Sequence, residues 1–175
     1  MPELDKLLQG KDGQPYLLRP IRPSDAPSLM RGYDAMSAQA KWFRMLYTVP
    51  HLTLETAARF CAPDPEREIC LVIEGRGALE GEILGGARIA VEADGRTAEF
   101  SVSLRPEAQS LGLARAALSA VLDAAQDKGC DVVWGIIARD NRPMLALAQR
   151  MGFALKPDPN DRTITRAGLK LGAPN

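Results

Sequence analysis

The chain has 175 residues, of which 46% are hydrophobic and 25% charged, values typical of one globular domain. Its 22 Lys and Arg residues balance its 22 Asp and Glu residues, aromatic residues make up 5%, and no basic run occurs. These features argue against binding to nucleic acid or to a membrane surface, since both need a basic patch. No apolar run is long enough to span a bilayer and the first residues lack a signal-peptide core, so we expect a cytoplasmic protein.

The first third of the chain predicts a hairpin followed by helices. Two strands, over 4–8 and 16–22, flank an Asp12-Gly13 pair that favours a tight turn. A helix begins after Pro23, with Ser24 as its expected N-cap. Two further helical stretches are predicted over 41–47 and from Thr53, as N-cap, to Phe60.

A run of strands follows. Three β-rich segments, separated by glycine-containing turns, predict an antiparallel meander; they cover 68–74, 83–92 and 97–104.

After Pro106 the pattern alternates between helix and strand. Apolar residues at helical spacing predict a helix over 114–126, with Gly129 as its C-cap. The remaining predicted elements are a strand over 131–138, a helix over 141–150, and strands over 153–156 and 163–171. The whole chain, 1–175, is therefore predicted to be one α/β domain with a mixed, mostly antiparallel twisted sheet and helices on both faces.

The segment 98–114 carries the most specific chemical signal, because it combines a strand, a short loop and a long helix. Free N–H groups and the positive dipole end make a helix N-terminus a binding site for anions such as a pyrophosphate. Gly112 and Ala114 are small enough to let a ligand approach the backbone, although packing of the helix start would also favour small residues. The loop has neither Gly-x-Gly-x-x-Gly nor the Lys-Ser/Thr of a P-loop, which argues against NAD and nucleoside triphosphates.

Two motifs resemble the GNAT superfamily of acetyltransferases. Its Gln/Arg-x-x-Gly-x-Gly/Ala signature is similar to the run Gln109-Ser110-Leu111-Gly112-Leu113-Ala114. Its second motif, an Asn-led helix ending in Gly-Phe, is similar to the run from Asn141 to Phe153. The segments 13–25 and 36–44 resemble the acetyltransferase domain of bacterial protein-lysine acetyltransferases. The resemblance covers nearly the whole chain and implies a GNAT-like fold with acetyl-CoA, or coenzyme A, as the bound acyl carrier.

The resemblance also implies roles for particular residues. Backbone groups at Val102 and Leu104 would hold the pantetheine arm as an added strand, and backbone N–H groups from Gln109 to Ala114 would hold the pyrophosphate. Asn141 would lie near the pantetheine or the thiol. Each of these residues also has a structural interpretation. Val102 and Leu104 are apolar side chains typical of a hydrophobic core, and Asn141 is a typical N-cap of the last helix.

The chain departs from the family pattern at two places. Ser110-Leu111 stands where many relatives carry Gly-Arg, which narrows the loop and removes one phosphate contact. The position where much of the family has a tyrosine that protonates the departing thiolate is Ala148. A thiolate is a good leaving group near neutral pH, so transfer does not require that tyrosine.

Glu99 is the candidate general base. An amine acceptor is mostly protonated near neutral pH, given a lysine pKa of about 10.4, and must lose a proton before it attacks a thioester. Glu99 lies on the strand that leads into the loop, where some family members place such a base. The alternative is a solvent-facing residue paired with Arg88 or Arg96. Glu107 is a second candidate, but a carboxylate beside phosphates is less well placed.

The sequence thus predicts an acyl-CoA-dependent enzyme that acetylates a primary amine, either a protein lysine or a small molecule. The alternative is a catalytically silent acyl-CoA-binding sensor or interaction module. The acceptor, the acyl chain length and the oligomeric state stay open, with a homodimer among the alternatives.

Two sets of residues receive no catalytic role. Trp42, Tyr47 and His51 fall in the segment where such enzymes shape the acceptor site; we expect core positions for the first two and a loop for His51. The three cysteines, Cys61, Cys70 and Cys130, have neither metal-ligand nor disulfide spacing, so we expect reduced thiols and no metal.

Overall fold

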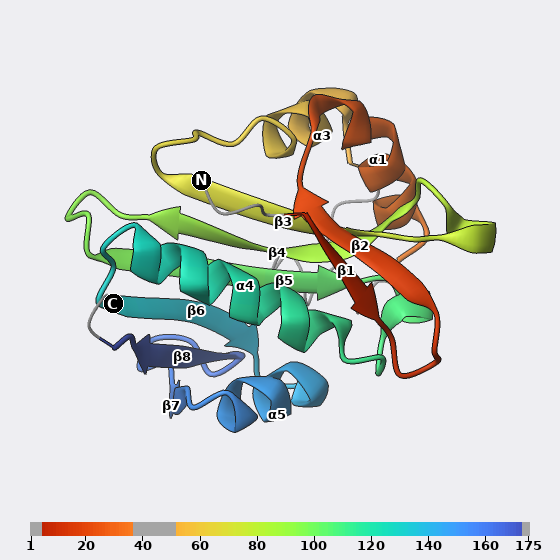
Figure 1. Ribbon diagram of the computed structural model, residues 1–175. Helices are drawn as coiled ribbons and strands as arrows, with labels where there is room; N and C mark the ends of the chain where they lie inside the picture. Colours follow the sequence, from red (N-terminus) through yellow and green to blue (C-terminus); the bar gives the residue numbers. More distant parts are fainter. Residues whose placement is uncertain (1–4, 37–51, 173–175) are drawn as a thin grey trace.

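One sheet of eight strands organises the residues that this computed structural model describes, 5–36 and 52–172 (Figure 1). The strand order is β1-β2-β3-β4-β5-β6-β8-β7. The strands are β1 (Lys6–Gln9), β2 (Pro15–Pro20), β3 (Glu68–Glu74), β4 (Ile83–Val91), β5 (Thr97–Leu104), β6 (Val132–Ala138), β7 (Ala154–Pro157) and β8 (Ile164–Lys170). All neighbouring strands are antiparallel except β5 and β6, which run parallel.

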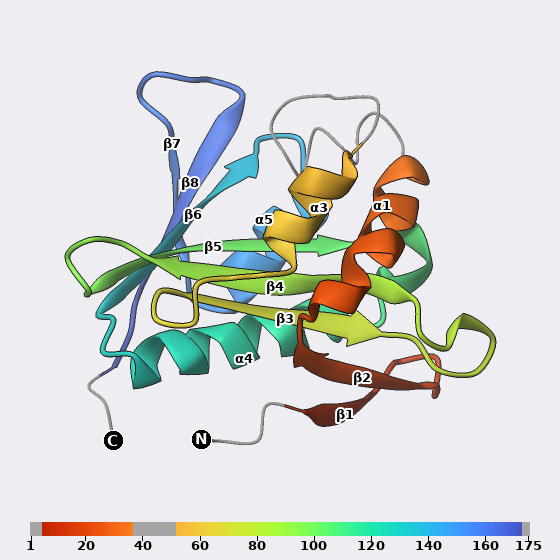
Figure 2. The same cartoon turned by 90° about the horizontal axis from the view of Figure 1, so that it is seen from above.

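Helices cover both faces of the sheet, as the sequence predicts. Helices α1 (Ala26–Asp34) and α3 (Leu54–Phe60) lie on one face, and α4 (Leu113–Asp127) lies on the other (Figure 2). Helix α5 (Arg142–Arg150) follows β6, and three 3₁₀ turns, η1 (Pro23–Asp25), η2 (Gly77–Leu79) and η3 (Pro106–Ala108), complete the described elements. The predicted α/β class, with a mixed and mostly antiparallel sheet, is therefore confirmed.

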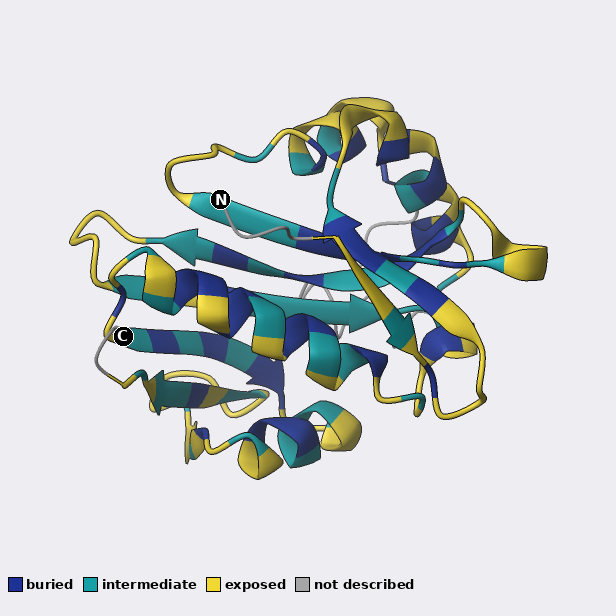
Figure 3. Ribbon diagram, viewed as in Figure 1, coloured by how far each residue is buried: buried dark blue, intermediate teal, exposed yellow. Residues whose placement is uncertain are grey.

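The main core lies between the sheet and α4. One side of α4 is buried, and Figure 3 shows dark blue bands alternating with exposed ones along this helix. Its buried residues include all six at the predicted helical spacing: Leu113, Ala117, Leu118, Val121, Leu122 and Ala125. A second, smaller cluster joins α1 and α3 on the opposite face, around Tyr33, Ala57 and Cys61.

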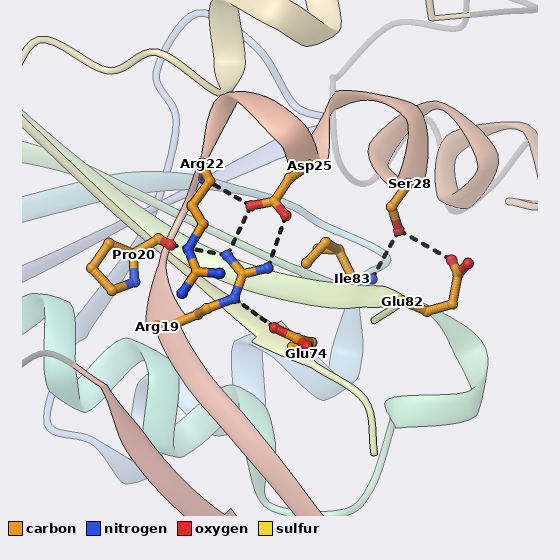
Figure 4. A network of polar contacts seen from close by, with 8 residues as sticks. All are labelled: Arg19, Pro20, Arg22, Asp25, Ser28, Glu74, Glu82 and Ile83. Atoms are coloured by element: carbon orange, nitrogen blue, oxygen red, sulfur yellow. Dashed lines mark hydrogen bonds and ion pairs between the residues drawn. The ribbon is translucent and has the colours of Figure 1, made fainter. Parts of the chain in front are cut away.

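A buried ion pair joins α1 to the sheet (Figure 4). The guanidinium of Arg19, on β2, donates two hydrogen bonds to the carboxylate of Asp25 at 2.8 and 2.9 Å. It also donates to Glu74 on β3 at 2.6 Å and to the carbonyl of Pro20 at 3.0 Å. Arg19 and Asp25 are only 3% and 6% exposed, so the pair is removed from water. Breaking such a pair costs about 3–5 kcal/mol, because one buried charge loses its partner.

A second polar cluster holds the middle of α1. The Ser28 hydroxyl accepts a hydrogen bond from the backbone N–H of Ile83 and donates one to Glu82. The Glu82 carboxylate also binds Arg31 and Arg105, and these bonds, with that from Arg31 the strongest, hold its pKa below the usual range. Helix α1 is thus fixed to the sheet at its first turn and at its centre.

One predicted cap is wrong. Ser24 lies within η1, and the residue at the start of α1 is Asp25, whose carboxylate accepts from the backbone N–H of Arg22. The turn η1 occupies Pro23–Asp25, so α1 begins only after it, and Asp25 makes no side-chain capping bond because its carboxylate binds Arg19 and the N–H of Arg22. The cap at Thr53 is confirmed, since its hydroxyl accepts from the N–H of Thr56. The predicted helix over 41–47, and the residues Trp42, Tyr47 and His51, lie outside the described residues.

Candidate active site

The sheet opens where β5 and β6 run side by side. Their parallel ladder has three Cα pairs, the last being Glu99 with Trp134, although both strands continue well past this point. Figure 2 shows β6 turning away from β5 beyond this pair. From Phe100 to Leu104, β5 stays paired with β4 but has left the ladder with β6. Its second edge therefore presents backbone N–H and C=O groups to whatever lies in the opening.

Strand β5 divides its side chains between the two faces of the sheet. Ala98 and Phe100 are buried in the main core, and Val102 and Leu104 pack against that core. Glu99, Ser101 and Ser103 alternate with them and lie on the opposite face, which we call the Glu99 face. The two serines line a pocket beneath α1 and α3. Val102 and Leu104 thus contribute apolar side chains to the core while their backbone groups line the opening, so their two predicted roles are compatible.

The loop before α4 has an unusual backbone. After η3, Ser110 has φ of +63° and Gly112 has φ of +82°. Ser110 is the one non-glycine residue with positive φ in the described part of the chain, a conformation that costs about 1–2 kcal/mol for a residue with a Cβ. This explains why many relatives carry glycine where this chain has Ser110. Strain of this kind is found most often at functional sites.

The N-terminus of α4 is suited to an anion. Its first intrahelical bond joins the N–H of Ala116 to the carbonyl of Gly112, so the N–H groups of Leu113, Ala114 and Arg115 have no intrahelical acceptor. The first turn contains no acidic residue. A Cβ built on Gly112 would have one described neighbour within 4 Å, the Lys11 side chain at 3.8 Å, so the space beside this residue is open. The loop and helix start therefore fit a pyrophosphate.

Lys11 is a candidate phosphate-binding residue that the sequence reasoning missed. It lies in the turn between β1 and β2, and its backbone N–H donates to the carbonyl of Leu111 at 3.1 Å. Its side chain passes Gly112 and is exposed. A cation beside the positive end of a helix is unfavourable unless an anion lies there too. No sequence motif could have found Lys11, because about 100 residues separate it from the loop that it contacts.

Glu99 is exposed on the surface of the Glu99 face and makes no hydrogen bond or ion pair with another described residue. The two arginines that could have neutralised it bind other carboxylates, Arg88 pairing with Glu68 and Arg96 with Asp131. Desolvation by the surrounding strands raises the pKa of Glu99, and repulsion from Glu92 raises it further. A carboxylate whose pKa lies nearer to neutral is a stronger base.

Asn141 lies at the N-cap of α5, where its side-chain oxygen accepts from the N–H of Met144 at 3.4 Å. The capping role is therefore present. Because parallel strands end at the same edge of a sheet, Asn141, shortly after β6, lies at the edge where β5 leads into the loop. Ala148 is fully buried, so the position of the absent tyrosine belongs to the core.

No group of three or more His, Cys, Asp or Glu side chains within 5–36 and 52–172 could hold a metal ion. Cys61, Cys70 and Cys130 are free thiols, and burial raises the pKa of Cys61 to about 11. Among the described helices, none is long and apolar enough to cross a membrane.

Comparison with known proteins identifies the family. Residues 16–154 match the family model of the acetyltransferase (GNAT) domain, so this chain belongs to the GNAT acetyltransferases. Its fold is similar to the GNAT domain of S. lividans PAT, with a TM-score of 0.85 and 21% identity over 98% of this chain and 99% of that one.

Two further relatives are informative. The structure of yncA from Salmonella typhimurium with its cofactor acetyl-CoA has a TM-score of 0.70 and 23% identity, covering 91% of this chain and 98% of that one. The L-amino acid N-acyltransferase MnaT of Escherichia coli is 34% identical over 102 residues, which are 58% of this chain and 56% of that protein. Proteins similar to this chain thus include one whose structure holds acetyl-CoA and one named as an L-amino acid N-acyltransferase.

Proposed function

We propose that this acetyltransferase moves an acetyl group from acetyl-CoA to a primary amine by direct attack, with Glu99 as the general base. The observation that carries the proposal is the carboxylate of Glu99, at the last rung of the β5–β6 ladder where the opening begins, which has no hydrogen-bond or ion-pair partner among residues 5–36 and 52–172. Acetyl-CoA supplies the acyl group as a thioester. The fold of this chain, with an anion-binding helix start and a free strand edge, suits the other parts of that donor.

Donor binding would depend mainly on backbone groups. The N–H groups from Gln109 to Ala114 would bind the pyrophosphate, that of Gln109 after leaving the carbonyl of Pro106, to which it donates at 3.2 Å. The edge of β5 at Val102 and Leu104 would pair with the amides of the pantetheine arm, which would replace the Gln109 side chain at the Leu104 carbonyl, now 3.5 Å away. Asn141 would lie beside the arm at the same edge of the sheet. Lys11 would supply a positive charge beside the phosphates, in place of the arginine that the family pattern has at the position of Leu111.

Glu99 would accept the proton that an ammonium group must lose, directly or through one water molecule. The ammonium first loses one proton to Glu99. The neutral nitrogen then bonds to the acyl carbon and the carbon–sulfur bond breaks. The second proton that the nitrogen loses passes to solvent. The departing thiol has an ordinary pKa near 8.5, so it leaves as a thiolate that solvent protonates. Positioning of the two reactants would supply much of the remaining acceleration.

The acceptor is a primary amine, on a protein lysine or on a small molecule. The similarity to MnaT, which is named as an L-amino acid N-acyltransferase, favours a small acceptor. The resemblance to bacterial lysine acetyltransferases favours a protein. A silent acyl-CoA-binding module is disfavoured, because such a protein would have no use for a carboxylate beside the opening that has a raised pKa and no ion-pair partner in the described part of the chain.

The test compares thiol release from acetyl-CoA by the wild type, Glu99→Gln and Glu107→Gln, with one working amine, between pH 6 and 10. Glu99→Gln should lower kcat/KM at pH 7 by about 10²–10⁴-fold and recover partly at high pH, where more of the amine is neutral. Glu107→Gln, on exposed η3, should match the wild type. Overlaying profiles for Glu99→Gln and the wild type would overturn the assignment of the base. Absence of thiol release with every amine, despite binding of coenzyme A, would favour the silent module.

A further inference from the structure

A cavity of about 100 Å³ lies on the Glu99 face, between the sheet and helices α1 and α3. Its walls are mainly apolar, and they include Leu29 and Tyr33 from α1, Phe60 from α3 and Val72 from β3. The cavity is part of the proposed active site, because two residues of β5, Ser101 and Ser103, form its floor.

One glycine keeps part of the cavity floor bare. Gly86 is paired with Ser103 across β4 and β5, so both lie on the Glu99 face. A Cβ on Gly86 would lie 2.2 Å from the carbonyl oxygen of Leu71, so this position cannot carry a side chain without moving the backbone of β3.

The charged groups at the border of the cavity are already neutralised. Arg88 pairs with Glu68, and Arg105 pairs with Glu82 and donates to a backbone carbonyl of α1. The Nε of Arg105 has no hydrogen-bond partner among the described residues, but Gly32 covers it closely, since a Cβ there would lie 2.6 Å away. The cavity therefore offers little to an anionic group.

The cavity also lies within reach of the proposed base. Ser101 is two residues from Glu99 on the same face of β5, which places their Cα atoms about 6.8 Å apart. A molecule with an amine beside Glu99 could therefore place the rest of its body over Ser101 and into the cavity.

We propose that the acceptor is a small primary amine with a compact apolar body that fills this cavity. The inference rests on the proposed function, which supplies the position of the reacting nitrogen. A protein lysine fits the site less well. With its amine beside Glu99, the carbon chain of the lysine must lead back to its own protein in solvent, so no part of it would fill the cavity. A cavity of 150 Å³ lined by apolar side chains holds benzene, so about 100 Å³ suits a body of roughly four to six carbon atoms.

The experiment measures kcat/KM at pH 8 with acetyl-CoA and four acceptors: ethylamine, 3-methylbutylamine, ethanolamine and Nα-acetyl-lysine amide. Each buried methylene group contributes about fourfold, so the three extra carbons of 3-methylbutylamine should raise kcat/KM over that of ethylamine by about 60-fold. Ethanolamine should be no better than ethylamine. Equal or higher kcat/KM with the lysine derivative would overturn the inference.

Two variants connect the preference to the cavity. Ser103→Leu should fill the floor and reduce the 60-fold ratio to a few-fold, while leaving coenzyme A affinity unchanged, because the donor contacts backbone groups. Leu29→Ala should enlarge the cavity and shift the preference toward 2-phenylethylamine. The matched control is Leu79→Ala, on η2, which lies outside the cavity and should keep the wild-type ratio.

The outcomes separate this inference from the proposed function. Activity with amines in general, but with the same ratio in wild type and Ser103→Leu, would refute the cavity as the acceptor site and leave the proposed function intact. If Ser103→Leu fails to fold, Leu29→Ala provides the same test in the opposite direction. Absence of activity with all four acceptors, in a protein that binds coenzyme A, would count against both.

Discussion

Asp25→Asn should be the most destabilising single change on the α1 side of the sheet. The substitution keeps the size of the side chain but removes the charge that neutralises Arg19, which is 3% exposed. Loss of one partner from a buried pair costs about 3–5 kcal/mol. Glu74 would still hold Arg19 through one hydrogen bond at 2.6 Å, so we expect the lower end, about 3 kcal/mol. For a chain of this length that corresponds to a fall in Tm of about 6–12 °C.

The assay is urea unfolding followed by circular dichroism, with Glu74→Gln and Asp123→Asn for comparison. Glu74 makes one hydrogen bond to Arg19 and its side chain is 16% exposed, so its loss should cost about 1–2 kcal/mol. Asp123 is exposed on α4 and its substitution should change stability by less than about 0.5 kcal/mol.

The pH dependence separates the ion pair from packing. Burial alone would raise the pKa of Asp25, but the bonds from Arg19 and from the backbone N–H of Arg22 outweigh it and hold the pKa below the ordinary 3.8. The folded state thus gains stability from the ionised carboxylate above that ordinary pKa, and loses it as the pH falls through the lower, folded-state value. The difference between wild type and Asp25→Asn should therefore shrink below about pH 4. Equal stability at pH 7, or a difference independent of pH, would refute the reasoning.

Three further predictions concern the active site. Gly112→Asn should weaken the binding of coenzyme A, measured by calorimetry, with little loss of Tm, because asparagine tolerates a positive φ. Gly112→Val should lower both the affinity and Tm, because valine does not tolerate the φ of +82° at this position. Unchanged affinity in the Asn variant would mean that the phosphates bind elsewhere. Lys11→Ala should weaken coenzyme A binding about three- to tenfold at low salt, and Lys6→Ala, equally exposed on β1, should not. Glu99→Gln should raise Tm slightly at pH 7 and have no effect at pH 4, because the ionised form of a group with a raised pKa is disfavoured in the folded state.

Local patterns predicted the elements well, because each depends on nearby residues. Strands β3 and β5 coincide with the predicted 68–74 and 97–104, since Gly75 ends the apolar run of β3, and Gly95 and Pro106 border β5. The apolar stripe of α4 likewise identified the residues that contact the sheet.

Features that depend on distant parts of the chain were missed. From the sequence alone Arg19 is a polar residue in a strand. Its buried ion pairs with Asp25 and Glu74 arise only when the folded chain brings these residues together. The same applies to Lys11, which meets the cofactor loop through tertiary packing. The separation of β5 from β6 has no sequence signal either, because strand propensity continues along both after pairing ends.

The short ladder between β5 and β6 also has a consequence for the dynamics of the molecule. Three residue pairs connect a unit formed by β1 to β5 with a unit formed by β6, β8 and β7. Units joined by few hydrogen bonds open separately in native-state amide exchange. The amides of β6 and β8 should therefore exchange as one group, faster than those at the centre of β4. A ligand that bridges the opening would add bonds across this junction and slow exchange on both sides of it, so the donor would act as a structural link between the two halves of the sheet.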